Sequence, residues 1–145
     1  MFKKILVPTD GSPLSDKAVN AAIEFAKMAG AEVVAISVAE AYPFPPISES
    51  PYSGGSQAYE QHALALAQEH VDRVAAAAEA AQVQCEAIVV EGLNPYEEIV
   101  KAAAEYHCDA IFMASHGRKG LNKLFAGSET QKVLAHTMLP VLVFR

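Results

Sequence analysis

The 145-residue sequence is poor in the residues that hold together small disulfide or zinc domains. It contains two cysteines, Cys85 and Cys108, and no tryptophan. The cysteines do not form a CxxC pair, and no histidine follows them at a zinc-ligand spacing. A disulfide scaffold and a structural zinc site are therefore excluded. We expect both cysteines to be buried free thiols in a reducing compartment.

Long apolar runs and an excess of positive charge are also missing. No uninterrupted apolar run approaches the roughly 18 residues of a membrane span. The opening MFKKILVPTD lacks the apolar core of a signal peptide, so we expect a cytoplasmic protein without a membrane partner. The formal net charge of −6 argues against a broad nucleic-acid-binding surface.

Apolar residues make up 52% of the chain, enough for a substantial core, and the length is typical of one domain. We expect one domain over residues 1–145. Short apolar stretches that predict buried strands alternate with segments of helical periodicity. The expected strands cover residues 5–8, 32–38, 85–92, 109–115 and 140–145, and the expected helices cover residues 13–29, 58–81, 94–108 and a last segment that begins at 128.

This alternation predicts an α/β fold, an open doubly wound five-stranded parallel sheet with helices on both faces. Right-handed crossovers leave few topologies, of which we assume the strand order 3-2-1-4-5. Helix boundaries are marked by Ser12 and Asn94 as N-caps and by Gly30 as a C-cap. Ser128 is expected to cap the last helix, with Gln131 in capping-box register.

The segment AEAYPFPPISESPYSGGSQ, residues 39–57, interrupts the alternation with four prolines and two adjacent glycines. It predicts a long loop. Its aromatic residues Tyr42, Phe44 and Tyr52 either cover a ligand or close over the core, and the sequence leaves both possibilities open.

Two connections that follow strands are rich in Gly, Ser, Thr and Asp: PTDGS at 8–12 and ASHGRKGLNKLFAGSET at 114–130. In open parallel sheets, ligands bind beyond the carboxyl ends of the strands, where the strand order reverses. With the order 3-2-1-4-5 these two connections are neighbours at that point. They therefore indicate a binding site at this edge of the sheet.

The residue types in these connections suit a nucleotide phosphate. Glycines let backbone amides approach an anion, and the start of a helix favours phosphate. Asp10 can accept from a ribose hydroxyl or an adenine amine, or contact a metal held by phosphates. Each residue also has a simpler interpretation as a turn former or cap. The remaining candidates are the glycines Gly117, Gly120 and Gly127, the hydroxyls of Ser128 and Thr130, and the cations Arg118, Lys119 and Lys123.

Neither a Walker A loop nor a GxGxxG fingerprint is present. The segment ILVPTDGSPLSDKAV nevertheless resembles the opening strand and loop of the universal stress protein family. SHG, nine further residues and GS resemble that family's nucleotide loop, GxxG-x9-G[ST], and the final PVLVFR also fits. The resemblance implies an adenine nucleotide alpha-hydrolase-like fold, a role in stress response or energy sensing, and ATP binding with Mg²⁺.

Carried over by position, the resemblance also implies the contact residues. The adenine and ribose contacts fall on Pro8, Thr9, Asp10 and Val38. The phosphate and sugar contacts fall on Met113, Ala114, His116, Gly117, Gly127, Ser128, Glu129 and Thr130. Ala114 stands where the motif has its first glycine, and its methyl group is harmless if the φ angle there is negative.

Catalysis is not expected beyond slow ATP hydrolysis. Hydrolysis needs a positioned water and charge stabilisation at the γ-phosphate. His116 is the one ionisable candidate base in the motif, and we interpret it as a loop histidine that orders the backbone. The other histidines, His62, His70, His107 and His136, have no metal spacing and are expected at the surface or on helix faces.

The last strand bears on assembly. Residues 141–144 are uncharged and lie at a predicted sheet edge, which favours pairing with a second chain. The resemblance likewise implies a homodimer through this strand.

Three functions remain open from the sequence. The first is a dimeric ATP-binding module. The second is a non-nucleotide interaction protein of the same fold, which the alanine at 114 favours. The third is a small hydrolase or transferase of α/β architecture.

Overall fold

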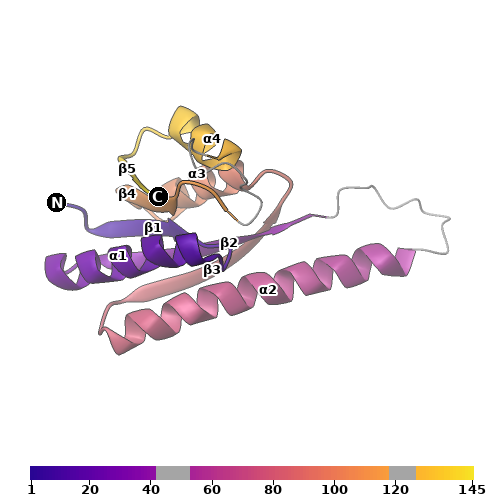
Figure 1. The fold of residues 1–145 in the computed structure, drawn as a ribbon, viewed down its shortest axis with the longest axis horizontal. Coiled ribbons are helices and arrows are strands. Elements are labelled where there is room, and N and C mark those ends of the chain that lie inside the picture. The colour runs from indigo at the N-terminus through magenta and orange to yellow at the C-terminus, as the bar shows by residue number, and fades with distance from the viewer. Residues whose placement is uncertain (42–52, 118–126) are drawn as a thin grey trace.

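The computed structural model describes residues 1–41, 53–117 and 127–145. Strands and helices alternate along the chain as the sequence predicts (Figure 1). In chain order they are β1 (Lys4–Pro8), α1 (Pro13–Ala29), β2 (Glu32–Glu40), α2 (Ser53–Ala80), β3 (Cys85–Gly92), α3 (Pro95–Glu105), β4 (Ala110–Ala114), α4 (Ser128–His136) and β5 (Val141–Phe144).

All five strands are parallel and follow the order β3-β2-β1-β4-β5, which confirms the assumed topology. Helices α1 and α2 pack on one face of the sheet, and α3 and α4 pack on the other (Figure 1). The central strand β1 pairs with β4 from Ile5 to Leu6, opposite Ala110 and Ile111. The turn after β1 and the connection after β4 therefore leave the sheet side by side.

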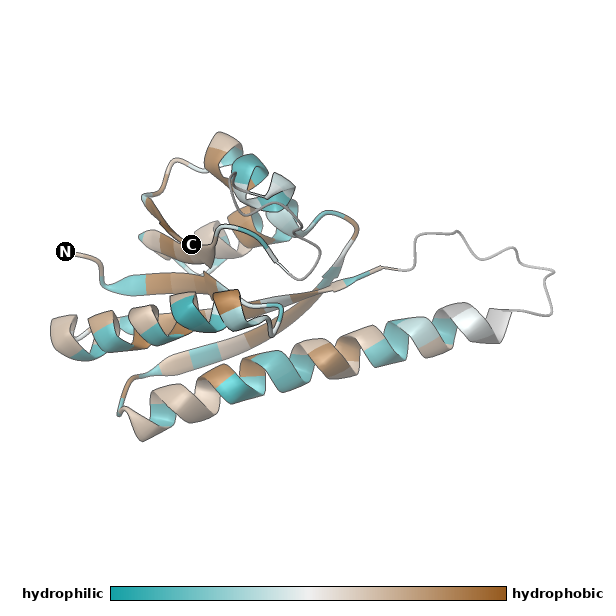
Figure 2. Ribbon diagram, in the orientation of Figure 1, coloured by the Kyte–Doolittle hydropathy of each residue, from teal (hydrophilic) through white to brown (hydrophobic). Residues whose placement is uncertain are grey.

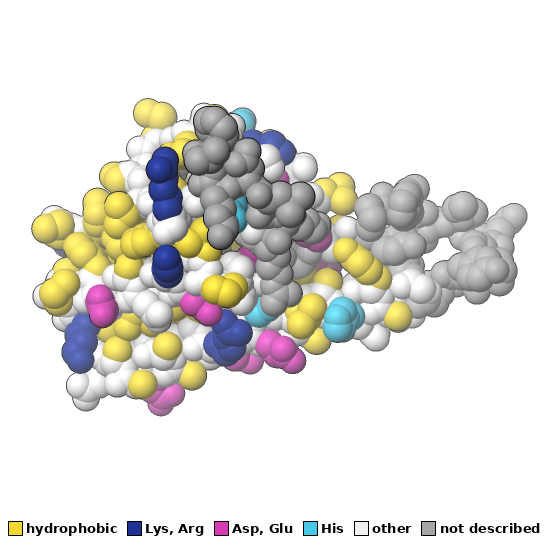
Figure 3. Space-filling view, in the orientation of Figure 1, with side chains coloured by type: hydrophobic (Ala, Val, Ile, Leu, Met, Phe, Trp, Pro, Cys, Tyr) yellow, Lys and Arg dark blue, Asp and Glu magenta, His cyan; other side chains and the backbone are white. Residues whose placement is uncertain are grey.

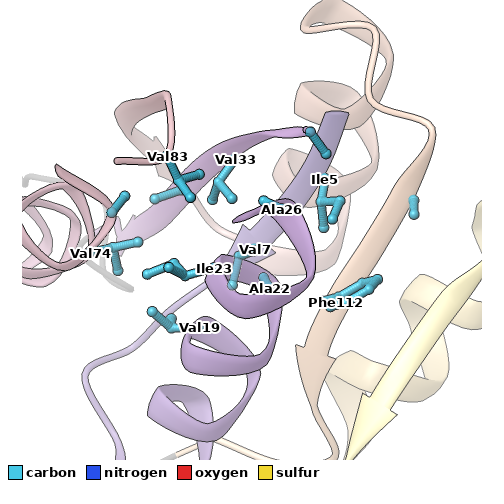
Figure 4. Close-up of a cluster of buried hydrophobic side chains, with 14 of the residues drawn as sticks. Ile5, Val7, Val19, Ala22, Ile23, Ala26, Val33, Val74, Val83 and Phe112 are labelled. Carbon is cyan, nitrogen blue, oxygen red and sulfur yellow. The ribbon is translucent and has the colours of Figure 1, made fainter. Parts of the chain in front are cut away.

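The core has two parts because each face of the sheet carries its own pair of helices. Hydrophobic residues concentrate in the central strands, whereas hydrophobic and hydrophilic residues alternate along the helices (Figure 2). Under α1 and α2, Ile5, Val7, Val19 and Phe112 belong to one cluster of buried side chains (Figure 4). Under α3 and α4 lies a second cluster that includes Leu6, Ile36, Ile99, Ile111 and Val133.

The boundaries of the first helix follow the expected capping chemistry. The Oγ of Ser12 accepts a hydrogen bond of 3.2 Å from the N–H of Ser15, as an N-cap does. At the other end Gly30 has a left-handed φ of 67°, which glycine adopts without strain. Both predictions are confirmed.

The starts of α2 and α4 and the cap of α3 differ from the sequence expectation. Helix α2 begins at Ser53, five residues before the expected start at 58. Asn94 holds the N-cap position of α3, but its amide donates to Oε1 of Glu97 and caps no backbone N–H. Helix α4 is capped by Gly127, with Ser128 as its first residue, because the N–H of Gln131 bonds to the Gly127 carbonyl.

Several other expectations have mixed outcomes. Cys85 and Cys108 are both free, but Cys85 is half-buried and Cys108 is buried. Burial raises the pKa of the Cys108 thiol to about 11. None of the helices in the described parts of the chain combines the length and the apolar character that a membrane span requires. The predicted roles of Tyr42, Phe44 and Tyr52 lie outside the described residues, as do those of Arg118, Lys119, Gly120 and Lys123.

Replacement of Leu6 by alanine tests the second core cluster. Leu6 is fully buried on β1, so its truncation should lower the free energy of unfolding by about 2–5 kcal/mol. Urea denaturation followed by circular dichroism measures the change. Leu134→Ala is the matched control, since Leu134 is 47% exposed on α4, and its effect should stay within about 0.5 kcal/mol. Equal effects would contradict the assigned core.

Candidate functional site

A cavity of about 270 Å³ opens at the carboxyl ends of the central strands. Its walls come from the ends of β1, β2 and β4 and from the N-terminal parts of α1, α3 and α4. The structure brings most of the candidate contact residues together in this lining: Pro8, Thr9, Asp10, Val38, Met113, Ala114, His116, Gly117, Glu129 and Thr130. Gly127 and Ser128 lie at the start of α4, next to Glu129 and Thr130.

The lining also contains residues that the sequence analysis did not single out. They are Ser15 on α1, Ile36 and Glu40 on β2, and Pro95 and Ile99 on α3. Ile36, Val38 and Glu40 are spaced by two residues on one strand, so they share a face of β2. This alternation is visible in the sequence once β2 is assigned, whereas the contribution of α3 depends on packing between distant elements.

The turn between β1 and α1 is held in shape by short-range hydrogen bonds. The Oδ1 of Asp10 accepts from the N–H of Ser12 at 3.0 Å, and the Oγ1 of Thr9 accepts from the N–H of Gly11 at 3.2 Å. Thr9 and Ser15 share a further side-chain hydrogen bond of 3.3 Å. These bonds fix the Asp10 carboxylate at the cavity wall before any ligand arrives.

Asp10 also reaches the other connection. A methyl group built on Gly117 would lie 2.5 Å from Oδ2 of Asp10. The carboxylate of the first turn therefore lies directly against the backbone of the second, and a side chain at 117 would require this carboxylate to move. Gly117 thus permits the close approach between the two turns, which is one of the reasons glycine occurs at such positions.

Bonds to the end of β4 fix the start of α4. The N–H of Gly127 donates to the carbonyl of Ser115 at 2.6 Å. The hydroxyl of Thr130 lies 2.9 Å from the carbonyl oxygen of Ala114 and 3.0 Å from that of Ser115. Thr130 is buried, and its hydroxyl proton is engaged within the protein. Its side chain therefore holds the helix start in place, while the first-turn N–H groups of α4 have no acceptor inside their own helix.

Glu129 connects two helices across the cavity rim. Its Oε2 accepts a hydrogen bond of 2.8 Å from the N–H of Tyr96, and its Oε1 lies 3.6 Å from the ammonium of Lys132. The carboxylate thereby caps the first turn of α3, the task expected of Asn94. No local motif reveals this contact, because Tyr96 and Glu129 are 33 residues apart.

His116 and Ala114 complete the wall at β4. The Nδ1 of His116 is hydrogen-bonded to the Oγ of Ser115 at 3.1 Å. Among the described non-glycine residues, positive φ angles occur at Gln82 and His107, so Ala114 sits in ordinary strand conformation. Its methyl group therefore causes no backbone strain, which meets the condition set by the sequence analysis.

The cavity has two chemically different ends. On the β2 side, Ile36 and Val38 provide an apolar wall that suits a flat ring. On the α4 side, the amide groups and positive dipole end of the helix favour an anion. The described residues contain no group of three His, Cys, Asp or Glu side chains that could hold a metal ion. On the face seen in Figure 3, Lys and Arg side chains are dispersed and form no continuous patch among the described residues.

Comparison with known proteins finds relatives that match this chain over its whole length. Residues 1–145 match the model of the universal stress protein family. Universal stress protein MJ0531 of Methanocaldococcus jannaschii is 34% identical over 145 residues, which span all of this chain and 83% of that protein.

Solved structures resemble the fold along nearly the whole chain. The structure of protein MJ0577 has a TM-score of 0.77 and 29% identity, and the match covers 99% of this chain and 96% of that one. A universal stress protein in complex with cAMP has a TM-score of 0.68 and 22% identity, with 99% and 97% coverage.

Replacement of Thr130 by valine tests the anchor of α4. Loss of the hydroxyl leaves two buried carbonyl groups without this donor, so the free energy of unfolding should fall by about 1–3 kcal/mol. Thr130→Ser is the matched control, because it keeps the hydroxyl and removes the methyl group. Chemical denaturation of both variants and of the unaltered protein measures the change: a valine variant as stable as the unaltered protein would show that the hydrogen bonds contribute nothing.

Proposed function

The chain belongs to the universal stress protein family, and on that basis we propose that it is an ATP-binding module. The proposed ligand is ATP accompanied by Mg²⁺, bound in a single domain formed by residues 1–145. The module acts in the cytoplasm, in the response to stress or to the energy state of the cell. It has little or no catalytic activity of its own.

The observation that carries the proposal is the meeting of two turns at one cavity. The Asp10 carboxylate lies against Gly117, and the amide-bearing start of α4 borders the same 270 Å³ space. The cavity wall is apolar at β2, carries the Asp10 carboxylate in the middle and ends at the start of α4. A ligand with a polar sugar between an aromatic base and a phosphate chain matches this order. The related protein crystallised with cAMP supports a nucleotide in particular.

The proposed arrangement assigns a part of ATP to each wall. The adenine ring lies against Val38 and Ile36 on β2, and Asp10 accepts a hydrogen bond from the ribose or the base. The phosphates receive hydrogen bonds from backbone amides in the first turn of α4, beginning at Ser128, where the helix dipole favours negative charge. Mg²⁺ prefers oxygen ligands and retains several waters, so phosphate oxygens and the Asp10 carboxylate fit its chemistry.

Little or no hydrolysis is proposed because binding requires less than turnover. Rapid phosphoryl transfer needs an oriented water and a cation at the γ-phosphate. His116, the candidate base, is hydrogen-bonded to Ser115. This contact favours a role in ordering the backbone.

A second candidate function is a partner-binding protein that takes no nucleotide. It is favoured by the number of cavity groups already used inside the protein: the Glu129 carboxylate caps α3, and the Thr130 hydroxyl bonds to β4. The two functions differ in one measurable respect, which is whether adenine nucleotide binds to the purified protein.

The proposal includes a homodimer formed through β5. This strand is the last in the sheet order, and Leu142 is 49% exposed on it. An apolar edge strand favours pairing with another chain.

Replacement of Gly117 by alanine tests the nucleotide site. The new methyl group displaces the Asp10 carboxylate from its place between the two turns, so ATP should bind at least about tenfold more weakly, a loss of about 1.4 kcal/mol. Isothermal titration calorimetry with ATP and MgCl₂ gives the dissociation constants.

Gly55→Ala serves as the control variant, because a methyl group on Gly55 in α2 meets nothing within 4 Å. It should bind ATP as the unaltered protein does. If the unaltered protein neither carries nor binds adenine nucleotide, the partner-binding function is favoured. Equal ATP affinity of the two variants would remove Asp10 and Gly117 from the site.

Replacement of Leu142 by lysine tests the dimer. A charge on the exposed edge of β5 opposes pairing of two edges, so the mass measured by sedimentation equilibrium should shift from twice the chain mass toward 15.4 kDa. Leu93→Lys is a control, since Leu93 is exposed outside β5. A monomer before any substitution would refute the dimer.

A further inference from the structure

His70 on α2 is a buried histidine that the proposed nucleotide site does not include. Of the two locations expected for it, the surface or a helix face, it occupies a helix face, and its exposed fraction is 9%. Its helical neighbours Val71 and Val74 belong to the core cluster under α1 and α2. The histidine therefore lies on the inward face of α2, toward the sheet and the turn that follows β1.

The imidazole ring packs directly against Gly11. A methyl group built on Gly11 would overlap the ring, with Cδ2 at 2.5 Å and Cε1 at 3.1 Å. Gly11 also has a left-handed φ of 74°. Glycine is thus required at this position for two reasons, the backbone conformation and the closeness of the ring.

The supported turn is the one that presents Asp10. Gly11 follows Asp10, its N–H donates to Thr9, and the next N–H, that of Ser12, donates to Asp10. Asp10 in turn lies against Gly117. A continuous line of contacts therefore runs from His70 through Gly11 and Asp10 to the second connection of the site.

An ion pair also joins α2 to the start of α1, next to the β1–α1 turn. Arg73 lies one helical turn after His70 and pairs with Asp16 in the first turn of α1, with 3.0 Å between Nη2 and Oδ1. Both side chains are about half exposed, and exposed pairs contribute little to stability. The buried ring of His70 is therefore the stronger support of the turn.

We propose that His70 is a positioning residue of the nucleotide site, because its ring against Gly11 holds the β1–α1 turn in the shape that binds ATP. This inference rests on the proposed function. When only a fraction of molecules has the competent turn, the apparent dissociation constant rises by the inverse of that fraction. Through His70, the affinity for ATP therefore depends on how closely α2 packs against the β1–α1 turn.

The first test replaces His70 by alanine or glutamine and measures ATP binding by calorimetry. Loss of the ring should weaken ATP binding about tenfold, which corresponds to a competent fraction of about one tenth. His62→Ala is the matched control, since His62 lies on the same helix with an exposed side chain. Arg73→Gln is a second control that removes the exposed ion pair and keeps the ring. Thermal unfolding of each variant verifies that it is folded at the assay temperature.

A double variant separates positioning from general stability. Gly11→Ala alone should bind ATP poorly, because its methyl group collides with the ring and its φ is strained. Removal of the ring relieves the collision, so Gly11→Ala/His70→Ala should bind ATP more tightly than the two single losses together predict. Such coupling in the dissociation constant is expected of residues in contact that act on one site.

Amide resonances of Asp10 and Gly117 supply the spectroscopic readout. In the nucleotide-free protein they should move in His70→Ala and stay in place in His62→Ala. Unchanged ATP affinity in both His70 variants, or losses that simply add in the double variant, would overturn the inference while ATP binding by the unaltered protein upholds the proposed function. Absence of ATP binding by the unaltered protein would overturn both.

Discussion

The parallel pairing of β1 with β4 is the constraint on which the site depends. These two strands are separated by roughly a hundred residues of chain, yet Leu6 lies opposite Ile111 in the sheet. The pairing brings the turn after β1 next to the connection after β4, and Asp10 then meets Gly117. Because β1 is central and buried on both faces, this register is stabilised by the whole core, and the site needs few contacts of its own to be ordered.

Much of the fold follows from local sequence, because its elements are marked by strong local signals. The apolar runs predict the five strands, and the Ser12 and Gly30 caps fix the ends of α1. The strand order was assumed from general topology and is confirmed. Helix starts were harder to predict where a residue from another element takes over the capping. At α3 the cap comes from Glu129 on α4, and no pattern near Asn94 reveals this.

The candidate site shows the same division between local and long-range information. Glycine and hydroxyl residues at the strand ends predict a binding site there, and Thr9, Gly117 and Thr130 do line the cavity. What the motif does not convey is that the Thr130 hydroxyl and the Glu129 carboxylate are engaged inside the protein. His70 was missed for a related reason, since a lone histidine in an alanine-rich helix carries no signal until its packing partner, Gly11, is known.

The length of α2 has a consequence for how its two halves hold together. The helix has 28 residues, about 42 Å at 1.5 Å per residue, and its beginning projects past the carboxyl ends of the strands (Figure 1). Among the side chains of α2 that the structure describes, the buried ones start at Ala67 and include Val71, Val74 and Ala78. The preceding turns gain little from burial, and short isolated helices are marginal in water. Hydrogen exchange should therefore divide one continuous helix into a fast-exchanging first half and a slow-exchanging second half.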